Sequence, residues 1–344
     1  MKAVVLAAGK SMRTYPLTLT RPKPVLPLLG RPLLAHTLEA LAAVADEAIL
    51  VVGYRAEMVR ATFGERYAGL KLEYRVQADQ RGTADAVASA RDAVAADFLV
   101  INGDDYYGAE NVKAVASASG AALLGAPVAS SGRFGVLEVE RGLLRRIKEK
   151  PADGGAALVN AGLYKVNQEI FAYVDPLEPS PRGELEFTAA LEKYATARAV
   201  AVVEAAAPWL PIATPQDLIS AQTLLWPAGE GSSIIGEGCR LSPEATVGGR
   251  SALGARCEVG ANAVVEASLL LDGVQVGEGA AVAGSALGEG VVVGAEAVVD
   301  GAALGDGARV GAGARVAPGS RVWPNVKITP GSVVTGDLKE SEKE

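Results

Sequence analysis

Cysteine, histidine and long apolar runs are scarce in this 344-residue chain. Two cysteines cannot form a disulfide framework. No apolar run approaches the roughly 18 residues of a membrane span, and the run at 4–8 is too short for a signal-peptide core. The formal net charge of −7 argues against broad binding to nucleic acid or to anionic membranes, because both need a basic surface. We therefore expect a cytoplasmic protein without a nucleic-acid or membrane partner.

The composition is otherwise that of a globular protein, with 49% hydrophobic and 21% charged residues. A chain of this length predicts about two domains. The 40 glycines are unevenly distributed, with 17 in residues 1–228 and 23 in residues 229–336. This shift predicts two different architectures in one chain.

The first two thirds of the chain alternate short aliphatic runs with helical patterns. Strands are predicted at 3–8, 47–54, 72–77 and 98–105, and helices at 32–44, 56–67 and 83–94. Nearly continuous apolar strands separated by helices indicate a parallel sheet covered on both faces. Beyond Gly120 the pattern becomes mixed β, with a hairpin at 135–140 and 143–150 and a strand at 157–166. The predicted class is α/β, with a Rossmann-like domain and a mixed, mainly parallel sheet.

A six-residue period begins at Ile235. Aliphatic residues recur at 235, 241, 247, 253, 259 and 265, and the period resumes at 276 and 282 and continues to 334. A small residue usually follows four positions later. This is the hexapeptide repeat of a parallel β-helix, with five or six coils. The spacing shortens to about five after Leu271, Val282 and Val299, where a turn must lose or loop out a residue. We predict domains at 1–226 and 234–336, a linker at 227–233 and a charged tail at 337–344.

Cys239 and Cys257 lie eighteen residues apart, which is one full coil. Stacked coils are about 4.8 Å apart, so the two side chains could be neighbours. They are either small core residues or a disulfide or metal pair. The first interpretation is favoured, because a cytosolic setting keeps thiols reduced.

Active sites of open α/β sheets lie at the carboxyl ends of the strands, where Gly9, Gln77 and Asp104 fall. The loop after Gly9 carries Arg13, and Lys23 follows between two prolines. Backbone N–H groups after a strand can cradle phosphate oxygens, and the two cations would neutralise a phosphoryl group. The alternative is a proline-rich loop with solvated surface charges.

Residues 6–34 resemble the signature of the sugar-1-phosphate nucleotidylyltransferases, L-A-x-G-x-G-T-R-x-x-P-L-T followed by P-K-P. That family includes glucose-1-phosphate thymidylyltransferases, N-acetylglucosamine-1-phosphate uridylyltransferases and mannose-1-phosphate guanylyltransferases. The chain departs from the signature at the second glycine and at the usual threonine. The resemblance implies that Arg13 and Lys23 are catalytic and that the nucleotide contacts Leu6, Ala8, Gly9, Ser11 and Met12.

Residues 76–86 resemble the family's base-reading segment. The resemblance implies that Gln77 pairs with a pyrimidine edge, that Gly82 lets the backbone approach the base, and that Thr83 lies beside it. The arrangement Gln-x-x-Gln-x-Gly-Thr is closer to uridylyltransferases than to thymidylyltransferases. Taken alone, Gln77 is an ordinary polar residue at a strand end.

Residues 100–107 resemble the Gly-Asp strand end whose aspartate binds the catalytic Mg²⁺. The resemblance makes Asp104 that ligand and Asp105 its neighbour. A carboxylate at the tip of a buried strand is costly unless a cation or hydrogen bonds satisfy it. The alternative is a pair of aspartates that start a turn.

Residues 133–164 resemble the sugar-binding half of the family. The resemblance implies contacts of the sugar 1-phosphate with Gly135, Glu149, Lys150 and Asn160. Residues 183–188 also resemble a segment near the sugar, although Ala189 stands where an aspartate is common.

A second metal ligand is missing from the expected place. The family has Trp-x-Asp-x-Gly ahead of a helix, and Pro211 aligns with that aspartate. Asp217 lies six residues later and is expected in the first turn of the following helix.

The resemblance implies a Mg²⁺-dependent transfer between a nucleoside triphosphate and a sugar 1-phosphate, with UTP or dTTP and glucose- or N-acetylglucosamine-1-phosphate favoured. It also implies a left-handed β-helix and a homo-oligomer formed through it. Two alternatives stay open. A hexapeptide acyltransferase would need a histidine in the β-helix, but the only one is His36. An inactive regulatory paralogue is suggested by Ser11, Met12 and Pro211.

Overall fold

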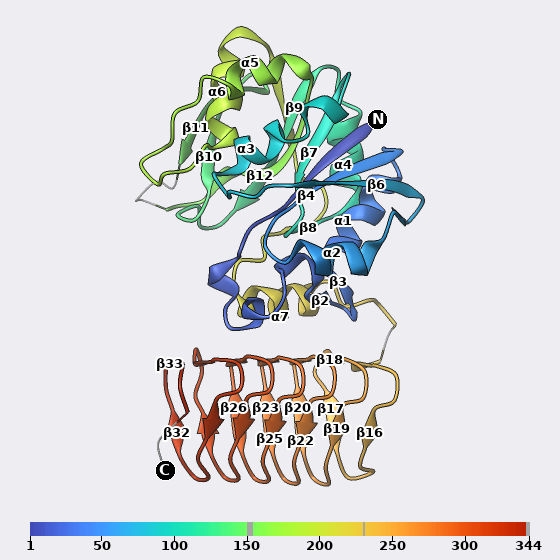
Figure 1. Cartoon of the computed structure of the whole chain (residues 1–344), viewed down its shortest axis with the longest axis vertical. Coiled ribbons are helices and arrows are strands. Elements are labelled where there is room, and N and C mark those ends of the chain that lie inside the picture. The colour runs from blue at the N-terminus through green and yellow to red at the C-terminus, as the bar shows by residue number, and fades with distance from the viewer. Residues whose placement is uncertain (150–153, 230, 342–344) are drawn as a thin grey trace. The chain divides into compact units, whose positions relative to one another are not determined.

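The computed structural model describes residues 1–149, 154–229 and 231–341 (Figure 1). The chain forms two compact units. The first combines Met1–Gly9 with Leu33–Pro211, and the second combines Lys10–Pro32 with Ile212–Glu344. The loop that carries Arg13 and Lys23 therefore belongs to the same unit as the β-helix. No helix among the described residues is both long and apolar enough to span a membrane.

The first unit is built on a ten-stranded mixed sheet of order β10-β11-β13-β9-β12-β7-β1-β4-β6-β5. Its parallel part consists of β7 (Phe98–Asn102), β1 (Lys2–Ala7), β4 (Glu47–Val52) and β6 (Leu70–Val76). Nearly all side chains of β1, β4 and β7 are buried, as expected of strands that are covered on both faces. The short strand β5 (Arg66–Tyr67) pairs antiparallel with β6 at the edge of the sheet.

The other half of the sheet is mixed, as predicted. Strand β12 (Ala157–Val166) runs antiparallel to β7 and to β9 (Ala121–Val128), and β13 (Val200–Glu204) runs parallel to β9. Strands β10 (Gly135–Glu140) and β11 (Leu143–Glu149) form the predicted hairpin. A separate pair joins β8 (Tyr106–Tyr107) to β14 (Trp209–Leu210).

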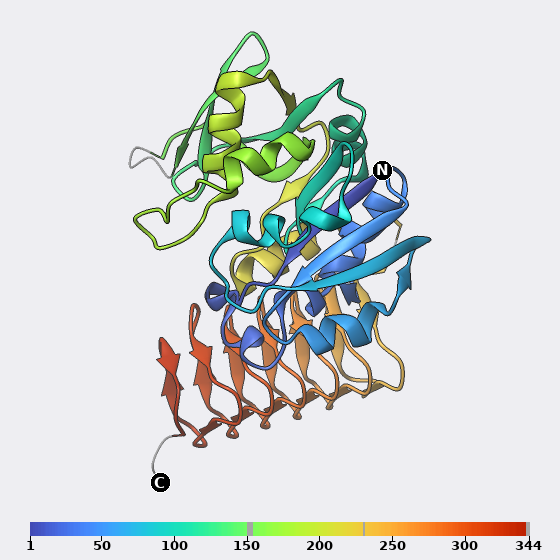
Figure 2. The same cartoon turned by 45° about the horizontal axis from the view of Figure 1, so that its top comes forward.

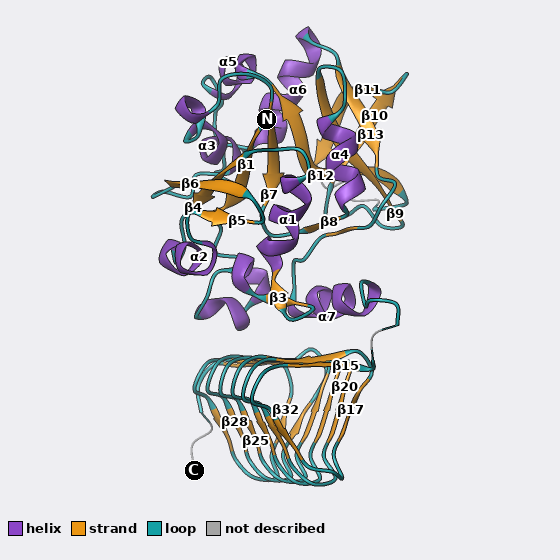
Figure 3. Cartoon of the chain, turned by 90° about the vertical axis from the view of Figure 1, so that its right-hand side faces the viewer, coloured by secondary structure: helices purple, strands orange, loops and turns teal. Residues whose placement is uncertain are grey.

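Helices cover this sheet in two packed groups, which Figure 3 shows in purple. One group contains α1 (Leu33–Ala42) and α4 (Ala109–Ala116), and the other contains α3 (Thr83–Ala88), α5 (Phe171–Val174) and α6 (Phe187–Ala197). The remaining helix of this unit is α2 (Ala56–Phe63), and short 3₁₀ turns occupy Arg91–Ala93 and Gln168–Ile170.

Two predicted helices are shorter than expected. The helix predicted at 56–67 ends at Phe63, because Gly64 takes a positive φ of 61° and the chain turns into β5. The helix predicted at 83–94 ends at Ala88 and is followed by the 3₁₀ turn. Helices α4 and α6 and strands β9 and β13 were not among the predicted elements.

The second unit contains the β-helix, whose coils stack side by side in Figure 2. Strands from successive coils form three parallel sheets. The first sheet contains β15 (Ser233–Ile235), β18 (Ser251–Leu253), β21 (Leu269–Leu270), β24 (Ala286–Leu287), β27 (Ala303–Leu304), β30 (Arg321–Val322) and β33 (Asp337–Leu338). The second contains β16 (Arg240–Leu241), β19 (Glu258–Val259), β22 (Gln275–Val276), β25 (Val292–Val293), β28 (Arg309–Val310) and β31 (Lys327–Ile328). The third contains β17 (Thr246–Gly248), β20 (Val264–Glu266), β23 (Ala281–Ala283), β26 (Val298–Asp300), β29 (Arg315–Val316) and β32 (Val333–Val334).

The predicted inward positions form the core of this β-helix. Its three parallel sheets are consistent with a left-handed β-helix. The aliphatic and small residues from Leu253 to Val334 pack into one buried cluster. In the first coil, Ile235 and Leu241 stay 42% and 40% exposed. The described residues form six complete coils and one further strand, β33, which agrees with the predicted five or six coils.

One detail of the repeat was predicted wrongly. The first shortening lies before Leu270, which pairs with Leu253 and Leu287, and not after Leu271. At this corner the turn is reduced to a single residue in the left-handed conformation. That residue is Ala267, Gly284 or Gly301 in successive coils, with φ of 46°, 54° and 53°.

Helix α7 (Pro215–Leu224) is attached to the β-helix. The side chain of Gln222 donates hydrogen bonds to the carbonyl oxygens of Arg250 (2.8 Å) and Ser268 (3.3 Å). In return, Arg250 Nη1 donates to the carbonyl oxygen of Thr223 at 2.6 Å. The N-terminal part of this unit adds the 3₁₀ turns Met12–Thr14, Leu17–Leu19 and Lys23–Val25 and the strand pair β2 (Pro27–Leu28) and β3 (Arg31–Pro32).

Candidate functional site

The carboxyl ends of the parallel strands meet at one edge of the first unit's sheet. Gly103 donates its backbone N–H to the carbonyl oxygen of Leu6 at 2.8 Å. A Cβ atom added to Gly53 would lie 2.9 Å from the carbonyl oxygen of Ala8 and 3.0 Å from that of Gln77. The ends of β1, β4, β6 and β7 are therefore closely packed, as predicted for an open α/β sheet.

Gly9 has open space around it, in contrast to its neighbours at this edge. It is exposed, and a Cβ atom at Gly9 would meet nothing within 4 Å. Ala8 is buried and Leu6 is half-buried inside the strand. The backbone after β1 is thus accessible to a ligand.

Gln77, Gly82 and Thr83 lie together at the start of α3. The Gln77 amide nitrogen donates to the carbonyl oxygen of Gly82 (3.0 Å) and to the Asp85 carboxylate (2.8 Å). Gly82 has a φ of 120°, and a Cβ there would lie 2.5 Å from the backbone oxygen of Leu185. Close packing against the 183–188 segment is thus one physical reason for this glycine. The Thr83 hydroxyl accepts the N–H of Phe187 at 2.9 Å.

Negative charge is concentrated where β7 ends. Asp104 is half-buried and Asp105 is 9% exposed. Burial raises the pKa of the Tyr107 hydroxyl, and the charges of Asp105 and Asp104 raise it further. The neutral Tyr107 hydroxyl donates to the carbonyl oxygen of Ala161 at 2.7 Å. Two carboxylates, the ligand type that Mg²⁺ prefers, therefore lie at this strand end.

The predicted sugar-binding residues on the hairpin and on β12 are close to one another. Gly135 faces Glu149 across the hairpin, and a Cβ at Gly135 would lie 3.1 Å from the Glu149 carboxylate. The Asn160 amide nitrogen donates to the Tyr164 hydroxyl at 2.7 Å. Burial raises the pKa of Tyr164, and the charge of Glu149 also raises it. Lys150 lies outside the described residues.

Two residues that the sequence reasoning missed also touch Glu149. The Thr188 hydroxyl donates to its carboxylate at 3.2 Å. Arg182 lies 3.8 Å from the same carboxylate and 2.8 Å from that of Glu186. Both residues flank or belong to the 183–188 segment, so extending that motif by one residue on its N-terminal side would have found them.

The loop that carries most of the family signature, Lys10–Pro32, belongs to the second unit and is called the signature loop below. Ser11 has φ 49° and ψ 52°, which is the left-handed conformation that favours glycine. The family's second glycine aligns with this residue, so the local backbone keeps the form that glycine would adopt most easily. The Thr18 hydroxyl holds the turn by donating to the carbonyl oxygen of Ser11 at 2.9 Å. Met12 is 66% exposed, and Arg13 is also exposed.

Lys23, like Arg21, is a buried cation of this loop. It is 3% exposed, and its ammonium group donates to the carbonyl oxygen of Ile212. The Thr14 hydroxyl donates to the neighbouring carbonyl oxygen of Ala213 at 3.0 Å. The loop is therefore attached to the residues that lead into α7.

Asp217 acts as a helix cap, as expected. Its carboxylate accepts the N–H groups of Ala213 (3.0 Å) and Thr214 (2.8 Å), while its own N–H is bound by the Thr214 hydroxyl. This reciprocal arrangement is a capping box at the N-terminus of α7. The carboxylate is thus used locally, six residues beyond Pro211.

Comparisons with known proteins agree with this architecture. The family described as nucleotidyl transferase matches residues 2–226, and the family described as GMPPB C-terminal domain matches residues 230–332. A glucose-1-phosphate thymidylyltransferase, so described, from Bacillus anthracis has a crystal structure with bound sucrose. It superposes with a TM-score of 0.60 and 28% identity, covering 67% of this chain and 97% of that one.

Two sequence relatives are informative. The bifunctional protein GlmU of Methanococcus maripaludis is 35% identical over 224 residues, which are 64% of this chain and 53% of the relative. The chain thus spans about half the length of that protein. The UTP–glucose-1-phosphate uridylyltransferase AglF of Haloferax volcanii is 32% identical over 200 residues, which are 56% of this chain and 82% of the relative. The chain belongs to the nucleotidyl transferase family.

Proposed function

We propose that this protein is a sugar-1-phosphate nucleotidylyltransferase. An oxygen of the sugar 1-phosphate attacks the α-phosphorus of a nucleoside triphosphate in line with the leaving group. The bond from the α-phosphorus to the bridging oxygen breaks, pyrophosphate leaves and a nucleotide sugar forms. No protein nucleophile is needed, so catalysis rests on positioning and on neutralising charge.

The observation that carries the proposal is the family match over residues 2–226, which contains the complete signature loop and the strand ends that carry Gly9, Gln77 and Asp104. The open backbone after β1 suits a phosphate cradle. The acidic end of β7 suits a cation that accompanies the phosphates.

We assign the nucleotide to Leu6, Ala8, Gly9, Ser11, Met12, Gln77, Gly82 and Thr83. Arg13 would hold the β- and γ-phosphates, and Lys23 would stabilise the α-phosphoryl group as charge develops on it. The exposure of Arg13 suits contact with a ligand from solvent. The burial of Lys23 suits a fixed, preorganised charge.

We assign the sugar 1-phosphate to Gly135, Glu149, Lys150 and Asn160. The Glu149 carboxylate can accept hydrogen bonds from sugar hydroxyls, and the Gly135 backbone lies beside it. Thr188 and Arg182 would hold the Glu149 carboxylate in place, because both contact it.

We assign Mg²⁺ to Asp104. No group of three or more metal-ligating side chains occurs among the residues that the structure describes. Mg²⁺ is commonly held by one or two carboxylates together with substrate phosphates, and the end of β7 fits that donor set. When bound, the ion would neutralise charge on the phosphate oxygens. With Pro211 at the family's second aspartate, the triphosphate would complete the coordination.

We favour a pyrimidine triphosphate, UTP or dTTP, with glucose- or N-acetylglucosamine-1-phosphate. Support for UTP comes from the Gln-x-x-Gln-x-Gly-Thr segment and from the relative named for UTP and glucose 1-phosphate. The proposal also includes a homo-oligomer formed through the β-helix and a cytoplasmic location.

The test is a panel of triphosphates and sugar phosphates with release of pyrophosphate as the readout. We expect the highest kcat/KM with a uridine or thymidine triphosphate and complete dependence on Mg²⁺. Release with no pair at all would refute the proposal and favour the inactive paralogue. Turnover of acetyl-CoA would favour the acyltransferase instead, although His36 lies in α1 and packs edge-on against Tyr106.

A further inference from the structure

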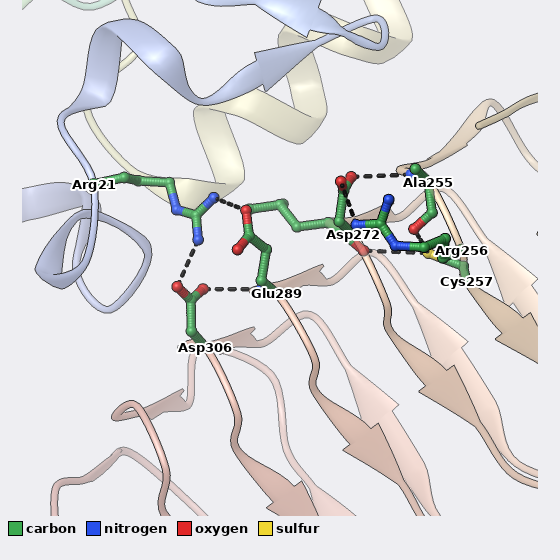
Figure 4. A network of polar contacts seen from close by, with 8 residues as sticks. Arg21, Ala255, Arg256, Cys257, Asp272, Glu289 and Asp306 are labelled. Atoms are coloured by element: carbon green, nitrogen blue, oxygen red, sulfur yellow. Dashed lines mark hydrogen bonds and ion pairs between the residues drawn. The ribbon is translucent and has the colours of Figure 1, made fainter. Parts of the chain in front are cut away.

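Arg21 joins the signature loop to the β-helix. It lies two residues before Lys23 and eight after Arg13. Its Nη1 atom lies 2.6 Å from the Glu289 carboxylate and its Nη2 atom lies 2.5 Å from the Asp306 carboxylate. Figure 4 shows the guanidinium between these two acids, which come from neighbouring coils.

The guanidinium depends on these partners, because its side chain is only 9% exposed. Burial alone would lower the pKa of Arg21, but the hydrogen bond to Glu289 and the charges of both acids raise it overall. The Nε atom has no hydrogen-bond acceptor among the described residues. Removal of the acids would leave a buried cation without compensation, so the loop would have to move.

The two acids also depend on Arg21. Asp272, Glu289 and Asp306 follow one another at intervals of seventeen residues, which is one coil in this part of the β-helix. Successive coils are about 4.8 Å apart, so like charges stacked in this way repel each other. The Arg21 guanidinium bridges two of the three carboxylates and offsets that repulsion.

The loop is not packed tightly against the coils everywhere. A cavity of about 400 Å³ lies between the two, lined on the loop side by Arg21, Val25, Pro27, Gly30 and Pro32. Two hydrogen bonds of the loop, from Thr14 and Lys23, run instead to the residues before α7. Arg21 therefore makes a two-fold ion-paired contact between the loop and the coils.

We propose that Glu289 and Asp306 are positioning residues for the nucleotidyl transfer, because they hold Arg21 and thereby set the place of Arg13 and Lys23 against the triphosphate. This inference rests on the proposed function. It gives the β-helix a role in positioning the triphosphate site, although the proposed function assigns none of its residues to the substrate.

The test compares full-length variants. Glu289→Gln together with Asp306→Asn removes both charges. The amide oxygen that Asp306→Asn introduces can still accept the Glu289 N–H, which the Asp306 carboxylate accepts at 2.9 Å in the wild type. Asp272→Asn is the matched control, because Asp272 accepts the Ala255 N–H at 2.9 Å in the same way but pairs with the exposed Arg256.

We expect the double variant to lose on the order of 10²-fold in kcat/KM for the triphosphate, since a misplacement of about 1 Å has this effect. The KM for the triphosphate should rise, while the KM for the sugar phosphate stays unchanged. Simple loss of folded protein would lower kcat and leave both KM values alone. Arg21→Gln should reproduce the defect, and adding the double change to it should cost nothing more. Arg21→Lys, which keeps the charge but not the fork, should be intermediate.

Hydrogen exchange supplies a readout that needs no activity. Exchange of the loop amides, such as that of Leu26, should become faster in the double variant and stay unchanged in Asp272→Asn. If the wild-type protein releases no pyrophosphate with any substrate pair, the proposed function fails, and the exchange data alone decide whether the acids anchor the loop. Wild-type kcat/KM in the double variant, or equal effects in the Asp272 control, would overturn the inference.

Discussion

The Lys23 ammonium group donates a hydrogen bond to the carbonyl oxygen of Ile212, the residue that follows Pro211. A buried cation of the signature loop is thus held by the chain segment in which the family carries its second aspartate. Because Lys23 is only 3% exposed, its position is fixed before any substrate arrives. Such a preorganised charge is most effective when negative charge develops nearby.

Lys23→Ala should therefore lower turnover by ~10²–10³-fold. The loss of the hydrogen bond to Ile212 should also lower the free energy of unfolding, by about 1–3 kcal/mol. Pyrophosphate release and urea denaturation measure the two effects separately. Lys10→Ala is the control, since Lys10 is an exposed lysine of the same loop and should keep both properties. Near-wild-type turnover in Lys23→Ala would refute the role of this lysine.

Two glycines at the predicted nucleotide site should respond in opposite ways to alanine. Gly9→Ala places a Cβ in open space, so the protein should keep its thermal stability. The same atom would narrow the proposed phosphate cradle, so the KM for the triphosphate should rise at least severalfold. Calorimetry and initial rates test this pair of results. A stable Gly9→Ala protein with an unchanged KM would argue against a phosphate at this turn.

Gly82→Ala should lower the stability of the protein, in contrast to Gly9→Ala. Its Cβ would lie 2.5–2.9 Å from the Leu185 backbone, and its φ of 120° is unfavourable for alanine. We expect a loss of about 1–3 kcal/mol of stability or more, measured by denaturation, whatever happens to nucleotide binding. A Gly82→Ala protein as stable as the wild type would contradict this packing argument.

Substitution of Asp104 and of Asp217 should have different effects on the Mg²⁺ requirement. Asp104→Asn should abolish most activity and shift the Mg²⁺ requirement of the remainder to higher concentration, because a carboxylate ligand is lost. Asp217→Ala should cost about 1 kcal/mol of stability through the lost capping box and leave the Mg²⁺ requirement unchanged. A Mg²⁺ titration of both variants decides between a ligand and a cap. A shifted requirement in Asp217→Ala would instead indicate that Asp217 is a metal ligand.

The parts of this protein that could be predicted from sequence are those with a strong local period. The hexapeptide repeat identified the inward residues from Leu253 to Val334, and the buried runs identified β1, β4 and β7. The residues at which helices end are harder to predict from sequence. Helix α2 ends at Phe63, four residues before the helical pattern does, because the positive φ of Gly64 outweighs the periodicity.

Contacts between distant residues could not be predicted in this way. Arg21 precedes a recognised motif, but its partners lie 268 and 285 residues away, and nothing in their local sequence marks them. Likewise, no sequence motif indicates that the Cβ position of Gly82, the glycine assigned to the base, faces the Leu185 backbone. Sequence motifs indicate which residues matter, and the tertiary structure supplies further reasons.

Cys257 offers a pH test of the β-helix core. Its thiol donates to the carbonyl oxygen of Leu271 at 3.2 Å, and the Cys239 thiol donates to the carbonyl oxygen of Gly254 at 3.1 Å. Both free thiols therefore pack in or against the core, as the favoured interpretation expects.

Burial raises the pKa of the Cys257 thiol from 9.0 to about 12. Between these values only the unfolded chain ionises this thiol, so stability should fall as the pH rises through this window. From pH 8 to pH 10 the wild type should lose about 1 kcal/mol more than Cys257→Ala, measured by urea denaturation. Tyrosines titrate in both proteins and cancel in the difference. Equal losses in the two proteins would show that Cys257 ionises normally and is not sealed in the core.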